Sequence, residues 1–479
     1  MKAEIKCGRL TIEDICSACS GELFLSGTSA DAEVSAICTD SREAEEKTLF
    51  AAIRGERVDG HDYVSKNLER GCPFALVSRM PKGIEGKKYA LVLVPDTVEA
   101  LGKIAQSYKS RFDISTVGIT GSVGKTTTKE FVSAVLSAGF KTFRTEGNYN
   151  STIGMPLSIM EIDEGTEAAV LEMGMSGFGE ISSMSRTARP DIAIITTIGT
   201  SHMEMLGSRE NICRAKLEIK DGLSEDGILL INGDEPLLIG AELPGVRTVS
   251  VALENRDADV RALNIRMGIS KTVFDIVCGD RVYPDIELPV MGRHYVYAAL
   301  FAFVCGKRLE MDVEAIRRGL LSYKNVGMRQ NIYELSGITV IEDCYNASPE
   351  SMRSSIDVLS ELAEKKGGRA VALLGDMLEL GESSPILHRE VGAYLARSGC
   401  RVLFTYGERA QNIAIAAVEG GVRAENVYTN PDLSAPALTG DMMLHALRKG
   451  DVVLFKASRS VAAERVIEYL KENSDKLPM

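Results

Sequence analysis

Short apolar runs alternate with amphipathic stretches along most of the chain, and this pattern is typical of an α/β protein. Strand-like runs lie at 50–53, 74–77, 91–94, 116–119, 168–171, 192–197, 227–231, 338–341, 370–374, 401–406 and 452–455. Helical spacing is found at 63–70, 98–108, 127–138, 352–365, 388–398, 407–419 and 462–473. The alternation predicts parallel sheets joined by crossover helices. Weak alternation over 252–286 leaves open whether further strands lie there.

The same pattern divides the chain into three parts. Residues 1–110 form short mixed elements, a strand, turn and helix begin a new pattern at Ser115, and a second α/β unit starts near Gly327. A length of 479 residues fits about three domains. We therefore predict domains at 1–110, 111–326 and 327–479. In parallel sheets, ligands bind at the carboxyl ends of the strands, so we expect the site there.

Composition and charge exclude several classes of protein. With 45% hydrophobic and 25% charged residues, the chain has enough apolar material for several cores. The formal charge of −12, from 55 basic and 67 acidic residues, argues against nucleic acid or an anionic membrane as a partner. No apolar run approaches the ~18 residues that a membrane span requires. The first residues contain no signal-peptide core, so we expect a cytoplasmic protein.

Ten cysteines are scattered without a repeating framework. Cys16 and Cys19 form one Cys-x-x-Cys pair, and no second pair follows at zinc-ribbon spacing. Neutral thiols in a reducing compartment are therefore favoured over a metal or redox role.

The strongest motif is a glycine-rich loop between a strand and a helix, Thr-Gly-Ser-Val-Gly-Lys-Thr-Thr at 120–127. Glycines allow backbone N–H groups to approach phosphate oxygens, Lys125 can bridge two phosphates, and the hydroxyl of Thr126 can hold Mg²⁺. Ile119 stands where the longer form of the loop has glycine, so this is a shortened variant. A structural glycine turn is the alternative. The predicted nucleotide-binding residues are Gly121, Ser122, Val123, Gly124, Lys125, Thr126 and Thr127.

Two further residues follow strands of the central part. Glu172 follows the run 168–171, and His202 follows the run 192–197. Alone, the first is often a helix cap and the second a structural histidine. Together with the phosphate loop they form a credible Mg²⁺ site, because this ion takes mostly oxygen ligands and few protein groups. Lys216 lies in a predicted helix, and on periodicity alone we expect it on a solvated face.

Polar clusters follow three strands of the last part of the chain. They contain Asp343 and Asn346 within 343–349, the segment 375–381, and Lys456 and Arg459 within 456–459. Arg329 begins the same unit. Each cluster alone could be turn chemistry. Together they suggest a binding edge that faces the nucleotide domain.

Jointly these motifs resemble the Mur ligases of peptidoglycan synthesis, over essentially the whole chain. The resemblance is carried by the loop 120–127 with Thr128-Lys129-Glu130, and by the segments 39–42, 54–61, 343–349 and 375–381. It implies an α/β, three-domain Mur ligase architecture, with a central P-loop parallel-sheet ATPase domain and a C-terminal Rossmann-like domain. The N-terminal domain would bind the UDP-precursor, and the C-terminal domain would bind the dipeptide and close on the nucleotide.

The resemblance also implies roles for single residues. ATP would be bound with two Mg²⁺ ions, the first held by Thr126 and Glu172 and the second by His202. Lys216 matches a lysine that becomes N-carboxylated in the family, and its carbamate would join the metal-binding set and support the γ-phosphate, where an ammonium would be repelled by two cations. With Lys125, the catalytic set is then Glu172, His202 and Lys216. The remaining assignments are Asn232, His294, Arg329 and Asp343 for the nucleotide, and Ser41, Arg42, Asn148, Asn150, Asn346, Lys456 and Arg459 for the other substrates.

One segment departs from the family pattern. Tyr295 and Ala298 stand where the family usually has asparagine near the adenine, so Asn232 is expected to carry more of that recognition.

The activity implied by the resemblance is ATP-dependent ligation of D-alanyl-D-alanine to UDP-N-acetylmuramoyl-tripeptide through an acyl phosphate. We expect a monomer with small-molecule substrates, no nucleic acid and no integral membrane segment. Two alternatives stay open. One is another amide ligase of the superfamily, which adds the third amino acid of the peptide or glutamates to folate. The other is a non-catalytic sensor that binds UDP precursors.

Overall fold

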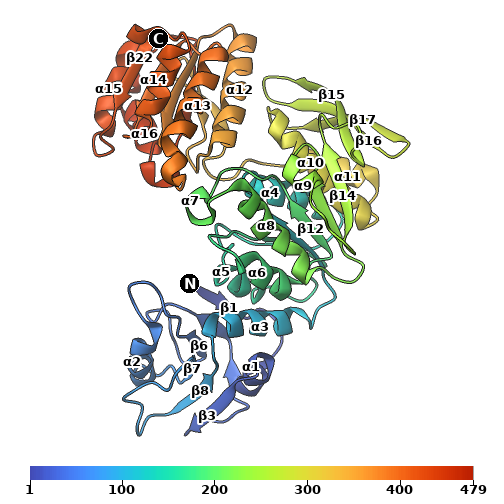
Figure 1. The fold of residues 1–479 in the computed structure, drawn as a ribbon. Coiled ribbons are helices and arrows are strands. Elements are labelled where there is room, and N and C mark those ends of the chain that lie inside the picture. Colours follow the sequence, from blue (N-terminus) through green and yellow to red (C-terminus); the bar gives the residue numbers. More distant parts are fainter. Residues whose placement is uncertain (478–479) are drawn as a thin grey trace.

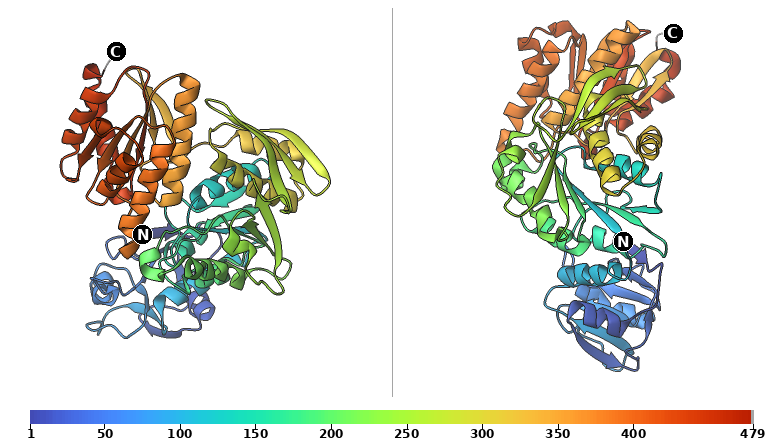
Figure 2. Two further views of the ribbon diagram at one scale, coloured as in Figure 1. Left: turned by 45° about the horizontal axis from the view of Figure 1, so that its top comes forward. Right: turned by 90° about the vertical axis from the view of Figure 1, so that its right-hand side faces the viewer.

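The computed structural model describes residues 1–477, and these residues form three main sheets that follow one another in chain order. In Figure 1 the first part lies at the bottom, the central part in the middle and the third at the top, and both views of Figure 2 show the same order. The predicted α/β class, with parallel sheets in three successive parts of the chain, is thus confirmed. No helix within residues 1–477 is both long and apolar enough to cross a membrane.

The first sheet has six strands in the order β1-β5-β6-β7-β8-β3. β1 and β3 are antiparallel edge strands, and the four between them are parallel. The strands are β1 (Lys2–Glu4), β3 (Glu22–Ser26), β5 (Ala36–Cys38), β6 (Thr48–Ala51), β7 (Phe74–Val77) and β8 (Tyr89–Leu93), with a separate pair β2 (Leu10–Thr11) and β4 (Glu33–Val34). The helices are α1 (Ile12–Cys19), α2 (Val64–Glu69) and α3 (Thr97–Lys109).

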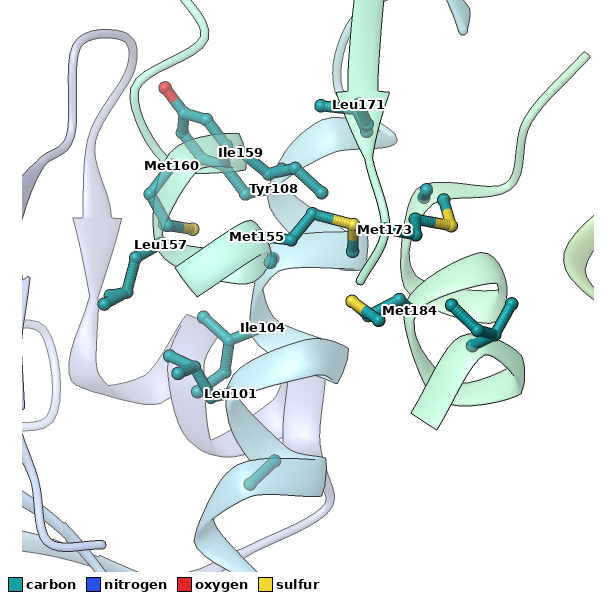
Figure 3. Packing of buried hydrophobic residues seen from close by; sticks show 14 of the residues in the cluster. Leu101, Ile104, Tyr108, Met155, Leu157, Ile159, Met160, Leu171, Met173 and Met184 are labelled. Atoms are coloured by element: carbon teal, nitrogen blue, oxygen red, sulfur yellow. The ribbon is translucent and has the colours of Figure 1, made fainter. Parts of the chain in front are cut away.

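The helix α3 joins the first part to the central part. The sequence predicts it as a helix that leads out of the first unit, and the structure adds that it packs on α5 (Gly154–Ile159) and α6 (Glu180–Ala188). Leu101, Ile104 and Tyr108 of α3 share one apolar core with the methionines of the central domain (Figure 3). The hydroxyl of Tyr108 donates to the carbonyl of Ile162 at 2.7 Å. A common core of this kind fixes the two parts against each other.

The central sheet has nine strands in the order β10-β11-β9-β12-β13-β14-β15-β16-β17. The first seven run parallel, and β16 and β17 complete an antiparallel extension. This answers the open question over 252–286, which does contain strands. The strands are β9 (Ser115–Thr120), β10 (Thr142–Arg144), β11 (Ala168–Glu172), β12 (Ile192–Ile195), β13 (Ile228–Asn232), β14 (Arg247–Ala252), β15 (Val260–Met267), β16 (Thr272–Cys278) and β17 (Arg281–Leu288).

Helices cover the central sheet on both faces, which is why its middle strands are apolar throughout. Besides α5 and α6, the helices of this part are α4 (Lys125–Leu136), α7 (Met203–Leu206), α8 (Arg209–Leu217), α9 (Pro236–Ile239), α10 (Arg293–Arg308) and α11 (Val313–Leu321). The helices α4, α10 and α11 pack together on one face.

The third sheet has six strands in the order β18-β19-β23-β20-β21-β22. All neighbours are parallel except the edge pair β18 and β19. The strands are β18 (Asn331–Leu335), β19 (Ile338–Glu342), β20 (Ala370–Gly375), β21 (Val402–Tyr406), β22 (Val427–Asn430) and β23 (Val452–Lys456). The helices are α12 (Pro349–Lys366), α13 (Ser384–Arg397), α14 (Gln411–Glu419), α15 (Pro436–Ala446) and α16 (Glu464–Glu472).

Candidate functional site

The phosphate loop lies between β9 and α4 and is held rigidly. Gly121 has φ 148°, and a Cβ atom there would lie 1.9 Å from Oγ1 of Thr196, so no other residue fits. The hydroxyl of Thr196 donates to the carbonyl of Val123 at 2.6 Å. Gly124 has φ 85° and is the N-cap residue, directly before α4. The backbone N–H groups at the start of α4 therefore point into the site, as anion binding requires.

Lys125 is the first residue of α4, and its ammonium bends back to the loop. Its Nζ donates to the carbonyl of Gly121 at 2.8 Å. Burial lowers the pKa of Lys125, the Glu172 carboxylate opposes this, and the Arg329 guanidinium lowers it further. A phosphate group in the loop would supply the anionic partner that this ammonium lacks.

Glu172 is the last residue of β11, beside the phosphate loop. Its Oε1 accepts a hydrogen bond from Nδ2 of Asn150 at 3.0 Å, whereas its Oε2 is buried and has no hydrogen-bond partner. The side chain is almost fully buried, so the orphaned oxygen is well placed for a cation. Within residues 1–477 there is no group of three or more His, Cys, Asp or Glu side chains that could bind a metal alone. A metal here would need phosphate oxygens, hydroxyls or water as additional ligands.

His202 precedes α7 and adopts a left-handed backbone conformation with φ 65°. Its Nδ1 lies 2.8 Å from Oε2 of Glu379, a residue of the third part. This contact leaves Nε2 of His202 as the nitrogen available to a ligand. His202 lowers the pKa of Glu379 through their hydrogen bond.

Lys216 lies in α8 and is only 1% exposed. The expectation of a solvated face is therefore wrong. Ile212 and Cys213 are buried on the same helix, and Lys216 follows them by four and three positions, which already places it on their face. Burial and the nearby charge of Lys125 hold the pKa of Lys216 well below its usual value. Within residues 1–477 its side chain makes no hydrogen bond or ion pair to the protein.

The third part contributes a second set of charges. Arg329 donates from Nη2 to the hydroxyl of Thr126 at 3.1 Å, and its guanidinium lies over the ring of Tyr345 at 4.0 Å. Lys456 is buried and its Nζ lies 2.6 Å from Oδ2 of Asp343. Burial would raise the pKa of Asp343, but Lys456 together with Ser355 and His294 outweighs it, and the net direction is downward.

Two more contacts join the third part to the central part. Glu350, at the start of α12, accepts hydrogen bonds from the backbone N–H of Thr200 at 3.1 Å and from its hydroxyl at 3.2 Å. The carbonyl of Glu379 accepts from the N–H of Glu204 at 3.3 Å. Sequence reasoning missed Glu350 and Tyr345 because their roles depend on how two separate sheets face each other.

Most of the residues described above line one cavity of about 540 Å³ between the central and third parts. It brings together most of the predicted site. The predicted residues that line it are Ser122, Val123, Gly124, Lys125, Thr126, Thr127, Asn150, Glu172, His202, Asn232, His294, Arg329, Asp343, Asn346 and Lys456. Gly121, Asn148 and Lys216 do not line the cavity, although Gly121 and Lys216 interact with Lys125.

Three other predicted residues lie away from this cavity. Arg42 and Ser41 follow β5 in the first part, and the guanidinium of Arg42 is 85% exposed and paired with Asp40 at 2.6 Å. Arg459 follows β23 and is paired with Glu464 of α16.

The expected adenine region contains tyrosines with partners of their own. Tyr297 donates to Oδ2 of Asp234 at 2.7 Å, and Tyr295 donates to Oδ1 of Asn325 at 3.2 Å. His294 lies against the ring of Tyr295, and burial lowers its pKa to about 4, so the imidazole is neutral. A neutral ring at the cavity wall offers a flat surface for a base to stack on.

Comparisons with known families cover most of the chain. Residues 33–109 match the Mur ligase family catalytic domain, residues 119–306 the Mur ligase middle domain, and residues 328–459 the Mur ligase glutamate ligase domain. These three stretches fall in the three structural parts.

Individual relatives match over nearly the full length. The UDP-N-acetylmuramoyl-tripeptide–D-alanyl-D-alanine ligase of Bacillus subtilis is 38% identical over 91% of this chain and 93% of its own. The crystal structure of MurF from Acinetobacter baumannii has a TM-score of 0.85 at 29% identity, covering 97% of this chain and 99% of that one. MurF ligase from Thermotoga maritima, in complex with ADP, has a TM-score of 0.81 at 30% identity, covering 92% and 98%.

Proposed function

The chain belongs to the Mur ligase family, and we propose that it joins D-alanyl-D-alanine to UDP-N-acetylmuramoyl-tripeptide in an ATP-dependent step of peptidoglycan synthesis. The observation that carries this proposal is the shared cavity. The phosphate loop of the central part and the strand ends of the third part line the same space, so a nucleotide and an acceptor can meet there.

The reaction has two steps. The terminal carboxylate of the tripeptide attacks the γ-phosphorus of ATP, forming an acyl phosphate and releasing ADP. The amine of D-alanyl-D-alanine then attacks the acyl carbon, and inorganic phosphate leaves from a tetrahedral intermediate as the amine loses a proton. Both steps need crowded negative charge to be neutralised and two reactants to be aligned.

The chain's own cations meet part of this demand. Lys125, at the start of α4, would bind the phosphates of ATP from the central part, and Arg329 would reach them from the third part. Arg329 is already within 3.1 Å of the hydroxyl of Thr126 and is supported by the ring of Tyr345. The aromatic support holds the guanidinium in one orientation without satisfying its hydrogen-bond donors.

The residues around the loop fit Mg²⁺. Glu172 presents a buried oxygen without a partner, the hydroxyl of Thr126 lies in the same cavity, and His202 has one nitrogen available. We propose that Thr126 and Glu172 hold one ion and that His202 holds a second. Bound Mg²⁺ would neutralise phosphate charge and polarise the transferred phosphoryl group.

Lys216 suits N-carboxylation for a chemical reason. Only the neutral amine attacks carbon dioxide, giving a carbamate and a proton, and the lowered pKa of Lys216 favours that form. Its side chain has no protein partner in residues 1–477, so nothing in the fold competes for the amine. The carbamate would be an anion close to Lys125.

The other substrate contacts are proposed by position. Ser41 and Arg42 would bind the uridine end, Asn148 and Asn150 the tripeptide, and Asn232 and His294 the adenine. Asp343 would reach the nucleotide, and Asn346, Lys456 and Arg459 would contact the dipeptide or the phosphates. We also propose that the chain acts as a monomer in the cytoplasm, because one chain supplies every residue of the site and the reaction consumes ATP.

Phosphate release is the direct test. The protein should release phosphate and form the pentapeptide when ATP, UDP-N-acetylmuramoyl-tripeptide and D-alanyl-D-alanine are all present. Omission of either the tripeptide or D-alanyl-D-alanine should abolish turnover. A panel of single amino acids and folate tests the other amide ligases. A sensor without catalysis would bind the UDP precursor and release no phosphate.

A further inference from the structure

A second lysine of α4 is buried beside the phosphate loop and has no role in the site described so far. Lys129 is 2% exposed. Its Nζ donates to the carbonyl of Thr145 at 2.8 Å and lies 3.3 Å from Oε1 of Glu130. The ammonium also lies 3.9 Å from Oε2 of Glu172, the orphaned oxygen, which is an ion-pair distance too long for a hydrogen bond. A fully buried ammonium is rare, and its removal from water must be offset by well-placed partners.

Lys129 reaches Glu172 by two routes. Through its charge it attracts the free oxygen of the Glu172 carboxylate. Through Thr145 it fixes the backbone, because the hydroxyl of Thr145 accepts the N–H of Glu172 at 3.0 Å while the carbonyl of Thr145 accepts from Lys129. Asn150 holds the other carboxylate oxygen. Both the main chain and the side chain of Glu172 are thereby fixed before any ligand arrives.

Neutralising Glu130 does not by itself explain the lysine. Glu130 already has a second cation, since Nη1 of Arg144 lies 2.5 Å from its Oε2. A methionine would fill nearly the same volume as Lys129 without burying a charge. The ammonium is therefore best explained by what it does for Glu172.

We propose that Lys129 is a positioning residue that orients the Glu172 carboxylate to receive a divalent cation. The inference rests on the proposed function, in which Glu172 holds Mg²⁺. Groups that orient a metal ligand typically contribute 10–100-fold to metal affinity.

The test measures metal binding without turnover. Mn²⁺ binding to the enzyme with ADP is titrated by electron paramagnetic resonance, and ADP binding without metal is titrated by calorimetry. Lys129→Met should weaken Mn²⁺ binding by about tenfold and leave metal-free ADP binding unchanged. Lys141→Met is the matched control, because Lys141 lies on the exposed side of the same region, paired with Asp163 at 2.9 Å. It should bind Mn²⁺ like the wild type.

A second variant protects the test against a folding defect. Thr145→Val keeps the shape of the side chain and removes only the hydroxyl that accepts the Glu172 N–H, so it should weaken Mn²⁺ binding in the same direction but less. Unchanged or tighter Mn²⁺ binding in a folded Lys129→Met protein would overturn the proposal. Glu172→Ala separates the two claims. If that variant binds Mn²⁺ with ADP as the wild type does, the proposed metal site itself is wrong.

Discussion

Replacing Lys216 by methionine should stabilise the protein while it abolishes turnover. The Lys216 residue is 1% exposed and burial holds the pKa of its amine well below the usual value, and a buried polar group without good hydrogen bonds costs about 1–3 kcal/mol. Methionine has a similar length and volume, and swaps of this kind usually cost less than about 1.5 kcal/mol in packing. The net gain should be about 1–2 kcal/mol in buffer free of bicarbonate.

Scanning calorimetry measures this gain. One kcal/mol shifts the midpoint of a domain of this size by about 2–4 °C, so the transition of the central domain should rise by about 2–8 °C. Bicarbonate should stabilise the wild type by mass action, because it forms a carbamate only where the lysine is present. It should leave Lys216→Met unchanged. Phosphate release by the variant should fall at least about a hundredfold.

The stability of the wild type should also depend on pH, because Lys216 changes its pKa on folding. The pKa of Lys216 is lowered on folding, so between the folded and unfolded pKa values the unfolded chain binds more protons. Wild-type stability should therefore rise with pH across that range, and the variant should lack this contribution. A variant that melts below the wild type in bicarbonate-free buffer, or that turns over normally, would refute the reasoning. Rescue of Lys216→Ala by short carboxylic acids would identify the missing group as an anion.

Three further outcomes are expected. Lys125→Ala should reduce phosphate release to below about one hundredth of the wild type, because it removes the ammonium that contacts the phosphate loop at the carbonyl of Gly121, and near-normal release would contradict the nucleotide assignment. Glu350→Gln replaces a charge-assisted contact to Thr200 by a neutral one, which weakens the contact between the central and third parts. Small-angle scattering of the ligand-free protein should therefore give a larger radius of gyration, and an identical scattering curve would mean that this contact does not hold the third part. Glu379→Gln removes the charge that orients His202, so half-maximal turnover should need several-fold more Mg²⁺ than in the wild type. A Mg²⁺ titration of turnover that is not shifted would contradict this expectation.

The local chemistry of the site could be predicted from sequence, and the phosphate loop shows why. Gly121 and Gly124, the strand before them and the helix after them all stand within one short segment of the sequence. Glu172 and His202 were found for the same reason, because each follows an apolar strand whose carboxyl end must lie at the sheet edge. Such features need no knowledge of how distant parts of the chain meet.

Features that depend on the meeting of two sheets could not be predicted in this way. Glu350 is an ordinary acidic residue at a helix start until Thr200, 150 positions earlier, is placed beside it. Tyr345 belongs to a recognised motif, but its contact with Arg329 appears only when the third sheet is folded. Lys216 is different, since the spacing from Ile212 already contained the signal for its burial.

Because the net charge of the chain is −12, anionic substrates must be bound by cations placed locally at the site. Five basic residues were expected to hold the anionic substrates, and two of them stand outside the cavity. Arg42 is paired with Asp40, and Arg459 is paired with Glu464. Each of these arginines can contact an anionic substrate only after its acidic partner is displaced. The two arginines therefore suit specific contacts with a bound substrate better than long-range attraction of phosphate groups.

Inside the cavity the protein's own positive charge is smaller than the sequence suggested. Lys456 is already neutralised by Asp343 at 2.6 Å. Lys125 and Arg329 are in no ion pair within residues 1–477, and burial, with a further contribution from the Arg329 guanidinium, lowers the pKa of Lys125. Two cations against the several negative charges of ATP leave a deficit in a site of low dielectric. Divalent cations at Glu172 would close that deficit, which is the physical reason to expect that turnover depends on Mg²⁺ and not on the protein's charge alone.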